Sequence, residues 1–351
     1  MKKSLHMLFA VMAIVMLAVS ACSPATPAST EAPVVEPTSV PTEVPPTEVP
    51  PTPMPELGTA DNPLIMALAP SATTQELQTG GQAIADKLSE LTGYTITVTV
   101  PTNYAAMIEA MGAGQAHIGW LAPFQYVVAH GKGYADVGLA TIRNGSDHYG
   151  FQFVANAAWA DKAGNTLTSY YDAATATNTA DAATALAQFA DKKPCWTDPL
   201  SSSGYVLPSG LLKQNEIKTK SGAWVQGHPT VIKSVYLSPK GEICDFGATF
   251  IDARSNVATD FPDVNDKVQI IWVSEPFIPN DNVSYAAGLP ADVREKLTQA
   301  LLDLAGTEEG ITLLKNGGYS IQGLKAVDDT FYDEFRVVLE ASGIDPTTLF
   351  K

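Results

Sequence analysis

From about residue 60 onward, strand-like segments alternate along the chain with segments whose hydrophobic residues have the spacing of a helix. Leu64–Ala69 is an apolar run of strand length, and Tyr94–Val100 alternates and is rich in β-branched residues. Between them, Thr73–Thr92 carries its large apolar residues at helical spacing. The alternation continues with predicted helices at Tyr104–Gly112 and Pro123–Tyr134 and predicted strands at His117–Ala122 and Val137–Ile142. Strand–helix alternation of this kind predicts an α/β fold with a largely parallel sheet.

The length of this patterned region predicts two lobes, because about 290 residues exceed what a single α/β core usually holds. We expect the chain to cross between the lobes twice, and therefore a two-segment hinge. The first lobe is predicted to hold residues 60–143 and 268–351, the second residues 147–255, and the hinge residues 144–146 and 256–267.

The first 21 residues have the pattern of a signal peptide. Lys2 and Lys3 precede the apolar stretch Met7–Val19, which is too short for a comfortable membrane span. The stretch ends in small residues followed by Cys22, which resembles a bacterial lipobox. We therefore expect Cys22 to be lipidated and to become the mature N-terminus. The alternative is ordinary cleavage near Ala21, and both alternatives predict an extracytoplasmic protein.

Residues 22–59 differ from the rest of the chain in composition. Pro, Thr and Glu dominate, and Glu43–Thr47 is repeated as Glu48–Thr52. Such a segment cannot bury a core and favours extended polyproline conformations. We interpret it as a disordered tether between a lipid anchor at the membrane and the globular part.

The net charge is strongly acidic. Removing residues 1–21 leaves 19 basic and 37 acidic residues, and hence a net charge of −18. Nucleic acid is excluded as a partner on this ground, because phosphate backbones are bound by basic surfaces. No metal or cofactor motif and no heptad pattern is present, so we expect a monomer without cofactors.

Two cysteines remain in the globular part, Cys195 and Cys244. Outside the cytoplasm an even pair forms a disulfide more often than two free thiols. We predict that they are bridged, which would join the strand before residue 201 to the strand at Ile243–Phe250.

The run Ser201-Ser202-Ser203-Gly204 carries the strongest chemical signal. It lies between a predicted strand and turn, Lys193–Leu200, and a predicted helix, Tyr205–Lys213. Three hydroxyls and several free backbone N–H groups at a helix start can bind an anion with several acceptor oxygens. The alternative is a simple N-cap, in which one serine satisfies its own helix.

Two tyrosines follow strands of the first lobe. Tyr104 starts a helix and Tyr126 lies in the turn after the next strand, both at carboxyl ends of strands, where α/β sheets bind ligands. A phenol donates a hydrogen bond to an oxyanion without adding charge. The alternative is a tyrosine packed by its ring.

Four local motifs together resemble the PhnD-like family, the substrate-binding proteins of ABC importers for phosphonate, phosphate or phosphite. The family commonly has glycine where this chain has Ala122. The motifs are Thr102–Ala110 followed by Gly114–Trp120, then Leu121–Tyr126, Asp198–Tyr205 and Ile278–Asp281. The resemblance implies a type II periplasmic-binding fold with a ligand cleft at the hinge, and an ABC permease as partner.

The resemblance also implies roles for individual residues. Tyr104, Tyr126 and the serine run would contact the ligand, and His228 stands where the family has a ligand-facing histidine. Asp252 and Glu275 stand in a region where acids meet the amine of aminoalkylphosphonates in some relatives. An acid here could also accept a proton from a monoprotonated phosphonate or phosphite. The alternatives are a surface His228, an Asp252 paired with Arg254, and a solvated Glu275.

Two rival functions are weighed against solute capture. Ser202, His228 and Asp252 occur in an order that a hydrolase triad could use, but no Gly-x-Ser-x-Gly motif surrounds the serine. A sensory module that signals to a membrane receptor would look the same in sequence. We expect capture of a phosphorus oxyanion for import, without catalysis.

Overall fold

The computed structural model describes residues 56–343, and for residues 318 and 319 the backbone only. The predicted signal peptide, the lipidation of Cys22 and nearly all of the predicted tether at 22–59 lie outside the described residues. Among the described residues, no helix is both long enough and apolar enough to cross a membrane.

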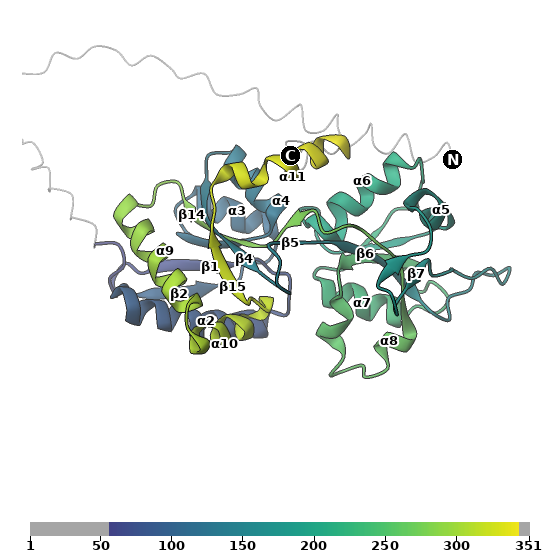
Figure 1. Cartoon of the computed structure of the whole chain (residues 1–351), viewed down its shortest axis with the longest axis horizontal. Helices are drawn as coiled ribbons and strands as arrows, with labels where there is room; N and C mark the ends of the chain where they lie inside the picture. Colours follow the sequence, from purple (N-terminus) through teal and green to yellow (C-terminus); the bar gives the residue numbers. More distant parts are fainter. Residues whose placement is uncertain (1–55, 344–351) are drawn as a thin grey trace, which may run out of the picture. The chain divides into compact units, whose positions relative to one another are not determined.

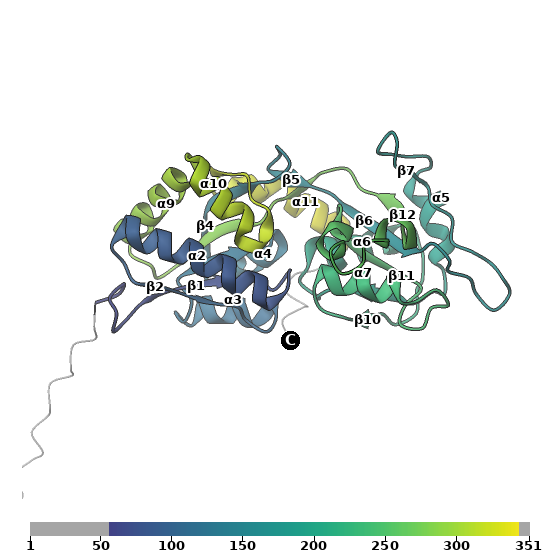
Figure 2. The same ribbon diagram turned by 90° about the horizontal axis from the view of Figure 1, so that it is seen from below.

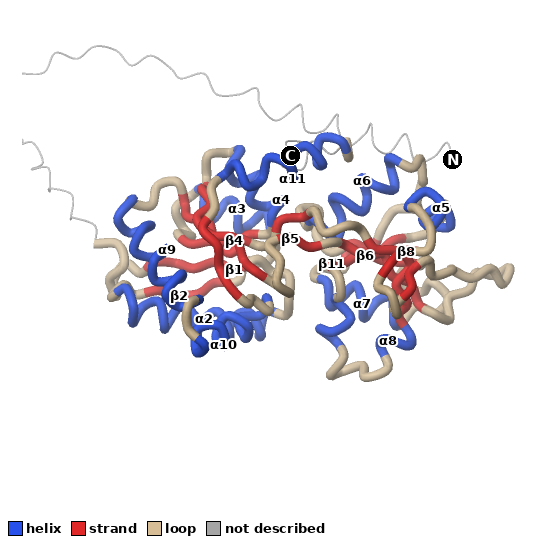
Figure 3. Tube along the Cα trace, viewed as in Figure 1, coloured by secondary structure: helices blue, strands red, loops and turns tan. Residues whose placement is uncertain are grey.

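Two sheets organise the described chain, each with its own helices (Figures 1 and 3). We call the parts around them lobe 1 and lobe 2. The sheet of lobe 1 has six strands in the order β15-β4-β14-β3-β1-β2, and β14 and β15 run against the other four. Its strands are β1 (Leu64–Leu68), β2 (Ile96–Thr99), β3 (Ile118–Leu121), β4 (Ala135–Ile142), β14 (Asn282–Ala286) and β15 (Gly323–Ala326).

The helices of lobe 1 follow the predicted pattern. In α2 (Thr74–Thr92), the Thr73 hydroxyl accepts a hydrogen bond from the Glu76 N–H, and Gly93 ends the helix at φ 73°. Helix α2 lies beside α9 and α10 (Figure 2). The other helices are α3 (Tyr104–Gly112), α4 (Pro123–Gly131), α9 (Ala291–Ala305), α10 (Glu308–Leu314), η5 (Lys315–Tyr319), η6 (Asp329–Tyr332) and α11 (Asp333–Ala341).

The sheet of lobe 2 has five strands in the order β10-β9-β11-β6-β12, of which only β6 runs against its neighbours. The strands are β6 (Phe151–Asn156), β9 (Pro194–Trp196), β10 (Ala223–Trp224), β11 (Phe246–Phe250) and β12 (Val268–Val273), and β7 (Tyr171–Asp172) pairs with β8 (Thr177–Asn178) outside the sheet. The helices are α5 (Ala182–Leu186), η2 (Ala187–Phe189), η3 (Ser202–Val206), α6 (Leu207–Gln214), α7 (His228–Tyr236), η4 (Ala253–Val257) and α8 (Val264–Lys267).

The predicted position of the second hinge segment, 256–267, is wrong. Strand β12 pairs with β6 in the sheet of lobe 2, so residues 256–267 lie within that lobe and the chain leaves it only after Val273. The connecting ribbon is the pair β5 (His148–Tyr149) and β13 (Ile278–Pro279). The apolar pattern of residues 268–273 identified a strand correctly, but it contains no information about which sheet the strand joins.

The predicted disulfide between Cys195 and Cys244 is confirmed, with Cα atoms 5.5 Å apart. Cys195 lies in β9, and Cys244 lies just before β11, which pairs with β9 in parallel. The bridge therefore joins two adjacent strands that begin beside each other. It closes a loop of 49 residues, for which loop-closure entropy alone gives a stabilisation of about 4 kcal/mol.

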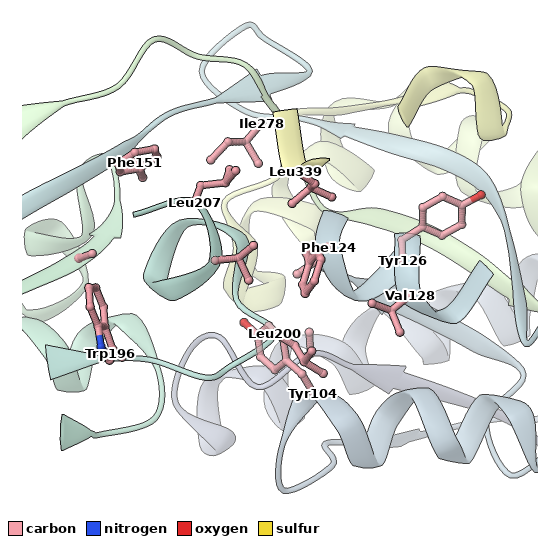
Figure 4. Packing of buried hydrophobic residues seen from close by; sticks show 14 of the residues in the cluster. Tyr104, Phe124, Tyr126, Val128, Phe151, Trp196, Leu200, Leu207, Ile278 and Leu339 are labelled. Atoms are coloured by element: carbon pink, nitrogen blue, oxygen red, sulfur yellow. The ribbon is translucent and has the colours of Figure 1, made fainter. Parts of the chain in front are cut away.

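One cluster of buried apolar residues includes side chains from both lobes. Phe124 of α4 belongs to it together with Leu200, Leu207 of α6 and Leu339 of α11 (Figure 4). All four are at most 3% exposed. Burial of this apolar surface stabilises the arrangement in which the lobes are in contact.

Candidate functional site

A polar cavity lies where the two lobes meet the connecting ribbon. The volume of the cavity is about 160 Å³. Its walls come from the first loop of lobe 1, the start of α3, the ends of β4 and β11, and the serine run. The lining residues are Ser71, Ala72, Tyr104, Ala122, Arg143, Asn144, Tyr149, Ser201, Ser202, Ser203, His228, Phe250, Ile251, Asp252, Ser255, Asn256, Asp281 and Ser320.

The serine run forms one wall, at the start of η3. The Ser201 hydroxyl oxygen accepts a hydrogen bond from the Gly204 N–H at 3.1 Å, so the N-cap alternative holds for this serine. A Cβ atom at position 204 would lie 2.0 Å from the Thr197 Oγ1, which explains why glycine ends the run. The Gly204 N–H is therefore used within the turn, and Gly204 does not line the cavity.

The other two serines also accept hydrogen bonds. Ser202 Oγ accepts from the Phe124 N–H at the start of α4 in lobe 1, at 3.0 Å. Ser203 Oγ accepts from the Tyr149 hydroxyl at 3.5 Å. The Ser202 hydroxyl also lies within hydrogen-bonding reach of Tyr149. Because a serine hydroxyl has one rotatable proton besides its lone pairs, each of the two groups can turn that proton toward a ligand in the cavity.

Tyr104 lines the cavity from lobe 1, where it is the first residue of α3 and is 3% exposed. Its backbone N–H donates to the carboxylate of Asp198, which comes from the turn before the serine run in lobe 2. Its carbonyl accepts from Gln125 Nε2 at 2.9 Å, so Gln125 serves to join α3 to α4. The start of α3 is thus tied to both lobes.

His228 is the first residue of α7 and is buried, not on the surface. Burial, with a smaller effect of the Arg143 charge, lowers the pKa of His228 to about 3, so the ring is neutral at physiological pH. Its Nδ1 accepts from the Phe250 N–H at 3.4 Å, which places the ring proton on Nε2. His228 therefore presents a neutral N–H donor.

Asp252 lines the cavity, but its oxygens are already engaged. Arg254 donates to them from its backbone N–H, Nε and Nη2 at 2.6 to 3.0 Å, and Gln152 Nε2 donates at 3.2 Å. Burial works to raise the pKa of Asp252, but the hydrogen bonds and charge of Arg254 outweigh it and hold this pKa below its ordinary value. The predicted pairing alternative, Asp252 with Arg254, is therefore the one observed.

Three further residues that were not predicted to contact the ligand form a corner of the cavity: the oppositely charged Arg143 and Asp281, and the neutral phenol of Tyr149. Arg143 Nη1 lies 3.6 Å from Asp281 Oδ2. Burial raises the pKa of Asp281, against the opposite effect of Arg143. Burial, followed by the Asp281 charge, raises the pKa of Tyr149. We call Arg143 and Asp281 the hinge pair, because they flank the connecting ribbon.

Tyr126 and Glu275, like Gly204, do not line the cavity, contrary to the prediction. Tyr126 lies in α4 and is fully buried. Its hydroxyl donates to Asp329 Oδ1 at 2.8 Å and its ring packs on Tyr332, so it belongs to the core of lobe 1 (Figure 4). Glu275 is exposed beside Phe277 in a different groove, and does not line the cavity.

The hydrolase alternative has no geometric support. In a triad the histidine Nδ1–H donates to a carboxylate, but here Nδ1 of His228 accepts from a backbone N–H and Asp252 is held by Arg254. The described residues also contain no group of three or more His, Cys, Asp or Glu side chains that could hold a metal.

Comparisons with known proteins agree with this geometry. Residues 66–332 match the family model of ABC transporter phosphonate periplasmic substrate-binding proteins. The chain is 25% identical over 295 residues to the phosphate-import protein PhnD of Mycolicibacterium smegmatis, covering 80% of this chain and 86% of that protein.

Solved structures show the same fold. A binding protein component of an ABC phosphonate transporter from Pseudomonas aeruginosa superposes with a TM-score of 0.66 at 17% identity, covering 80% of this chain and 86% of that one. PhnD1 from Prochlorococcus marinus in complex with methylphosphonate gives 0.63 at 13% identity, covering 78% and 96%. The fold is that of type II periplasmic-binding proteins, with two lobes.

These findings identify a transport protein that binds its substrate and is not an enzyme. They also agree with an extracytoplasmic location. The chain therefore belongs to the family of periplasmic substrate-binding proteins of phosphonate ABC transporters.

Proposed function

We propose that this protein captures a phosphorus oxyanion, namely phosphate, phosphite or a phosphonate, in the polar cavity and delivers it to an ABC permease. The observation that carries the proposal is the set of donors around one small cavity. Ser202 and Ser203 offer hydroxyls, His228 offers a neutral N–H, and Arg143 offers a cation. A tetrahedral oxyanion needs donors on several oxygens from a rigid frame.

The relatives support this class of ligand. The curated relative is named a phosphate-import protein, and one similar structure holds methylphosphonate. Both ligands are compact, which suits a cavity of about 160 Å³.

The donors come from different parts of the chain, so a ligand would bridge them. Tyr104 belongs to lobe 1, and the serine run and His228 belong to lobe 2. A ligand that contacts both lobes only when they are together stabilises that arrangement by the difference in affinity. The permease would then dock the loaded form.

The proposed membrane attachment is a lipid on Cys22, with residues 23–59 as the tether. The expected observation is that the protein made in its native host partitions into detergent, and that a Cys22→Ser variant partitions into the aqueous phase. Aqueous partitioning of the unaltered protein would contradict the anchor without affecting the proposed ligand.

Calorimetry of the purified protein tests the oxyanion proposal. We expect saturable binding of at least one of phosphate, phosphite and methylphosphonate. A Ser203→Ala variant should bind about tenfold more weakly, because a hydrogen bond to a charged oxygen contributes about 1.5 kcal/mol or more.

Ser209→Ala is the matched control. Ser209 lies in α6, where its hydroxyl donates to the Val206 carbonyl at 3.1 Å, and it does not line the cavity. The Ser209→Ala variant should bind the same ligand with the affinity of the unaltered protein. A panel with no binding at all would refute the proposal.

A further inference from the structure

We propose that the hinge pair makes the site selective for a protonated oxyanion without an amine. In this proposal Arg143 binds an ionised oxygen, and Asp281 shares one proton with another oxygen of the same ligand. The inference rests on the proposed function and narrows its ligand class to phosphate-like and simple phosphonate anions.

The first support is the unused hydrogen-bonding capacity of the pair. Both side chains line the cavity, and they are largely buried, 21% exposed for Arg143 and 14% for Asp281. Their separation of 3.6 Å is a charge contact and too long for a hydrogen bond. Within residues 56–343, no donor is hydrogen-bonded to the Asp281 carboxylate. A ligand in the cavity can therefore reach both groups.

The second support is the fixed position of Arg143. Its guanidinium lies 5.3 Å from the centre of the Phe250 ring, and that ring packs against His228 with centroids 4.6 Å apart. A guanidinium on an aromatic face keeps its in-plane N–H donors free for an oxyanion. The same packing places the cation beside the His228 donor, so the two can bind neighbouring oxygens.

The surroundings of Asp281 set which partner it accepts. Among the described residues, Arg143, Tyr149 and Tyr332 interact electrostatically with it, and His228 and Asp252 line the same cavity. An ammonium group bound by Asp281 would lie next to the Arg143 guanidinium, which repels it. Asp252 offers no alternative, because Arg254 and Gln152 already occupy its oxygens. The cavity therefore disfavours an aminoalkyl ligand.

A proton on the ligand satisfies the same carboxylate. A hydrogen phosphate or hydrogen phosphonate presents a P–OH group that Asp281 can accept, so that one proton is shared between two oxygens. Sulfate has no proton at neutral pH and would face Asp281 with another acceptor. Buried acceptors that face each other without a proton are costly. The hinge pair thus discriminates between anions of similar size and shape.

Calorimetry with phosphate and sulfate is the main test. The unaltered protein should bind phosphate at least about a hundredfold more tightly than sulfate, as an unmatched buried charge predicts. An Asp281→Asn variant should bind sulfate at least about tenfold more tightly than the unaltered protein does, because the amide can donate where the carboxylate cannot.

Asp147→Asn is the matched control. Asp147 lies in the same hinge region and pairs with Lys325 at 2.7 Å, but it does not line the cavity. Its loss removes the same charge and should leave the ratio of phosphate to sulfate affinity unchanged. Equal sulfate binding by Asp281→Asn and the unaltered protein would overturn the inference.

A second arm needs no variant. In mildly alkaline buffer methylphosphonate becomes a dianion without a proton, whereas phosphate at the same charge keeps one. The affinity for methylphosphonate should therefore fall by about tenfold or more relative to phosphate as the pH rises. A constant ratio would count against the shared proton.

A third arm tests the amine. 2-Aminoethylphosphonate should bind no more tightly than ethylphosphonate, which has the same length without the charge. Tighter binding of the amine by the unaltered protein would overturn the inference while leaving the proposed function intact. Failure of every ligand to bind would instead refute the proposed function itself.

Discussion

The serine wall and the hinge pair face the same cavity but are built in opposite ways. The wall is a continuous segment, Ser201–Ser203, whose groups already form hydrogen bonds within the protein and carry no charge. The hinge pair joins residues 138 positions apart, carries two opposite charges, and leaves hydrogen-bonding capacity unused. The wall therefore supplies a frame that is ready before the ligand arrives, and the pair supplies charged groups that can still form hydrogen bonds to the ligand.

This difference predicts that damage to the wall reduces both stability and affinity, whereas damage to the hinge pair changes the choice of ligand. The following experiments test the frame around the cavity, beginning with the largest expected effect.

The largest loss of stability is expected from removing the disulfide, which holds the strand that precedes the serine run. Replacing Cys195 and Cys244 with serine lowers the free energy of unfolding by about 4 kcal/mol, because the unfolded chain regains the entropy of the 49-residue loop. Chemical denaturation of both forms measures the difference. The folded fraction should keep its preference for phosphate over sulfate, and loss of that preference would show that wall and hinge pair are not independent.

Lowering the pH should destabilise the protein through His228. Its pKa is about 3 in the folded protein and 6.5 as an ordinary histidine, so the unfolded chain takes up the proton first. Stability is complete above pH 6.5 and falls below it by up to about 1.4 kcal/mol per pH unit, or about 2 to 3 kcal/mol by about pH 4.5. A His228→Gln variant, compared by thermal unfolding across this range, should lose less stability. Parallel curves would contradict the buried neutral ring.

Substituting Gly204 should disturb the wall directly. A Cβ atom 2.0 Å from Thr197 Oγ1 forces the turn to move, and overpacking of this kind costs about 1 to 3 kcal/mol. Gly204→Ala should therefore lower the melting temperature and the phosphate affinity together. Gly131→Ala is the control, because a Cβ atom there meets nothing within 4 Å at the end of α4. An unchanged phosphate affinity in Gly204→Ala would show that the turn at Gly204 does not influence the ligand site.

The smallest effect is expected at Tyr126. Tyr126→Phe removes the hydrogen bond to Asp329 and should cost about 1 kcal/mol of stability, while phosphate affinity changes by less than about twofold. Calorimetry and thermal unfolding of the same sample measure both quantities. A large loss of phosphate affinity would show that Tyr126 does contribute to ligand binding.

The sequence predicted the elements of the fold well because its local signals agree. The helical spacing of the apolar residues in α2, and the alternating residues of β2, are short-range patterns that tertiary packing did not override. The assignment of β12 to a lobe failed because strand pairing is a long-range property. Alternation of polar and apolar residues predicts a strand, but the partner of that strand lies more than a hundred residues away.

The site residues likewise divide into those that local patterns identify and those that depend on long-range packing. Ser202, Ser203, Tyr104 and His228 line the cavity as predicted, because each lies at the start of a helix and such positions can be identified from sequence. Tyr126 also follows a strand of lobe 1, but the prediction that it contacts the ligand failed. The side of α4 that faces the core cannot be inferred from one tyrosine. Arg143 was predicted only as the last residue of the first segment of lobe 1, since nothing local connects it with Asp281.

Helix α11 adds a third connection between the lobes. It follows the last strand of lobe 1 (Figure 1). Gln214 Nε2 of α6 nevertheless donates to the carbonyl of Ala341 at the end of α11 at 2.8 Å, and Lys213 Nζ donates to the carbonyl of Gly343, just after the helix, at 3.1 Å. Ser342 packs on Gly210 of α6. Two rigid bodies joined at two points can rotate about the line through those points, but a third joint off that line blocks the rotation. Opening of the cleft therefore requires the α11–α6 hydrogen bonds to break, unless all three connections lie on one line. A spectroscopic distance label on α11 and α6 would report the angle between the lobes.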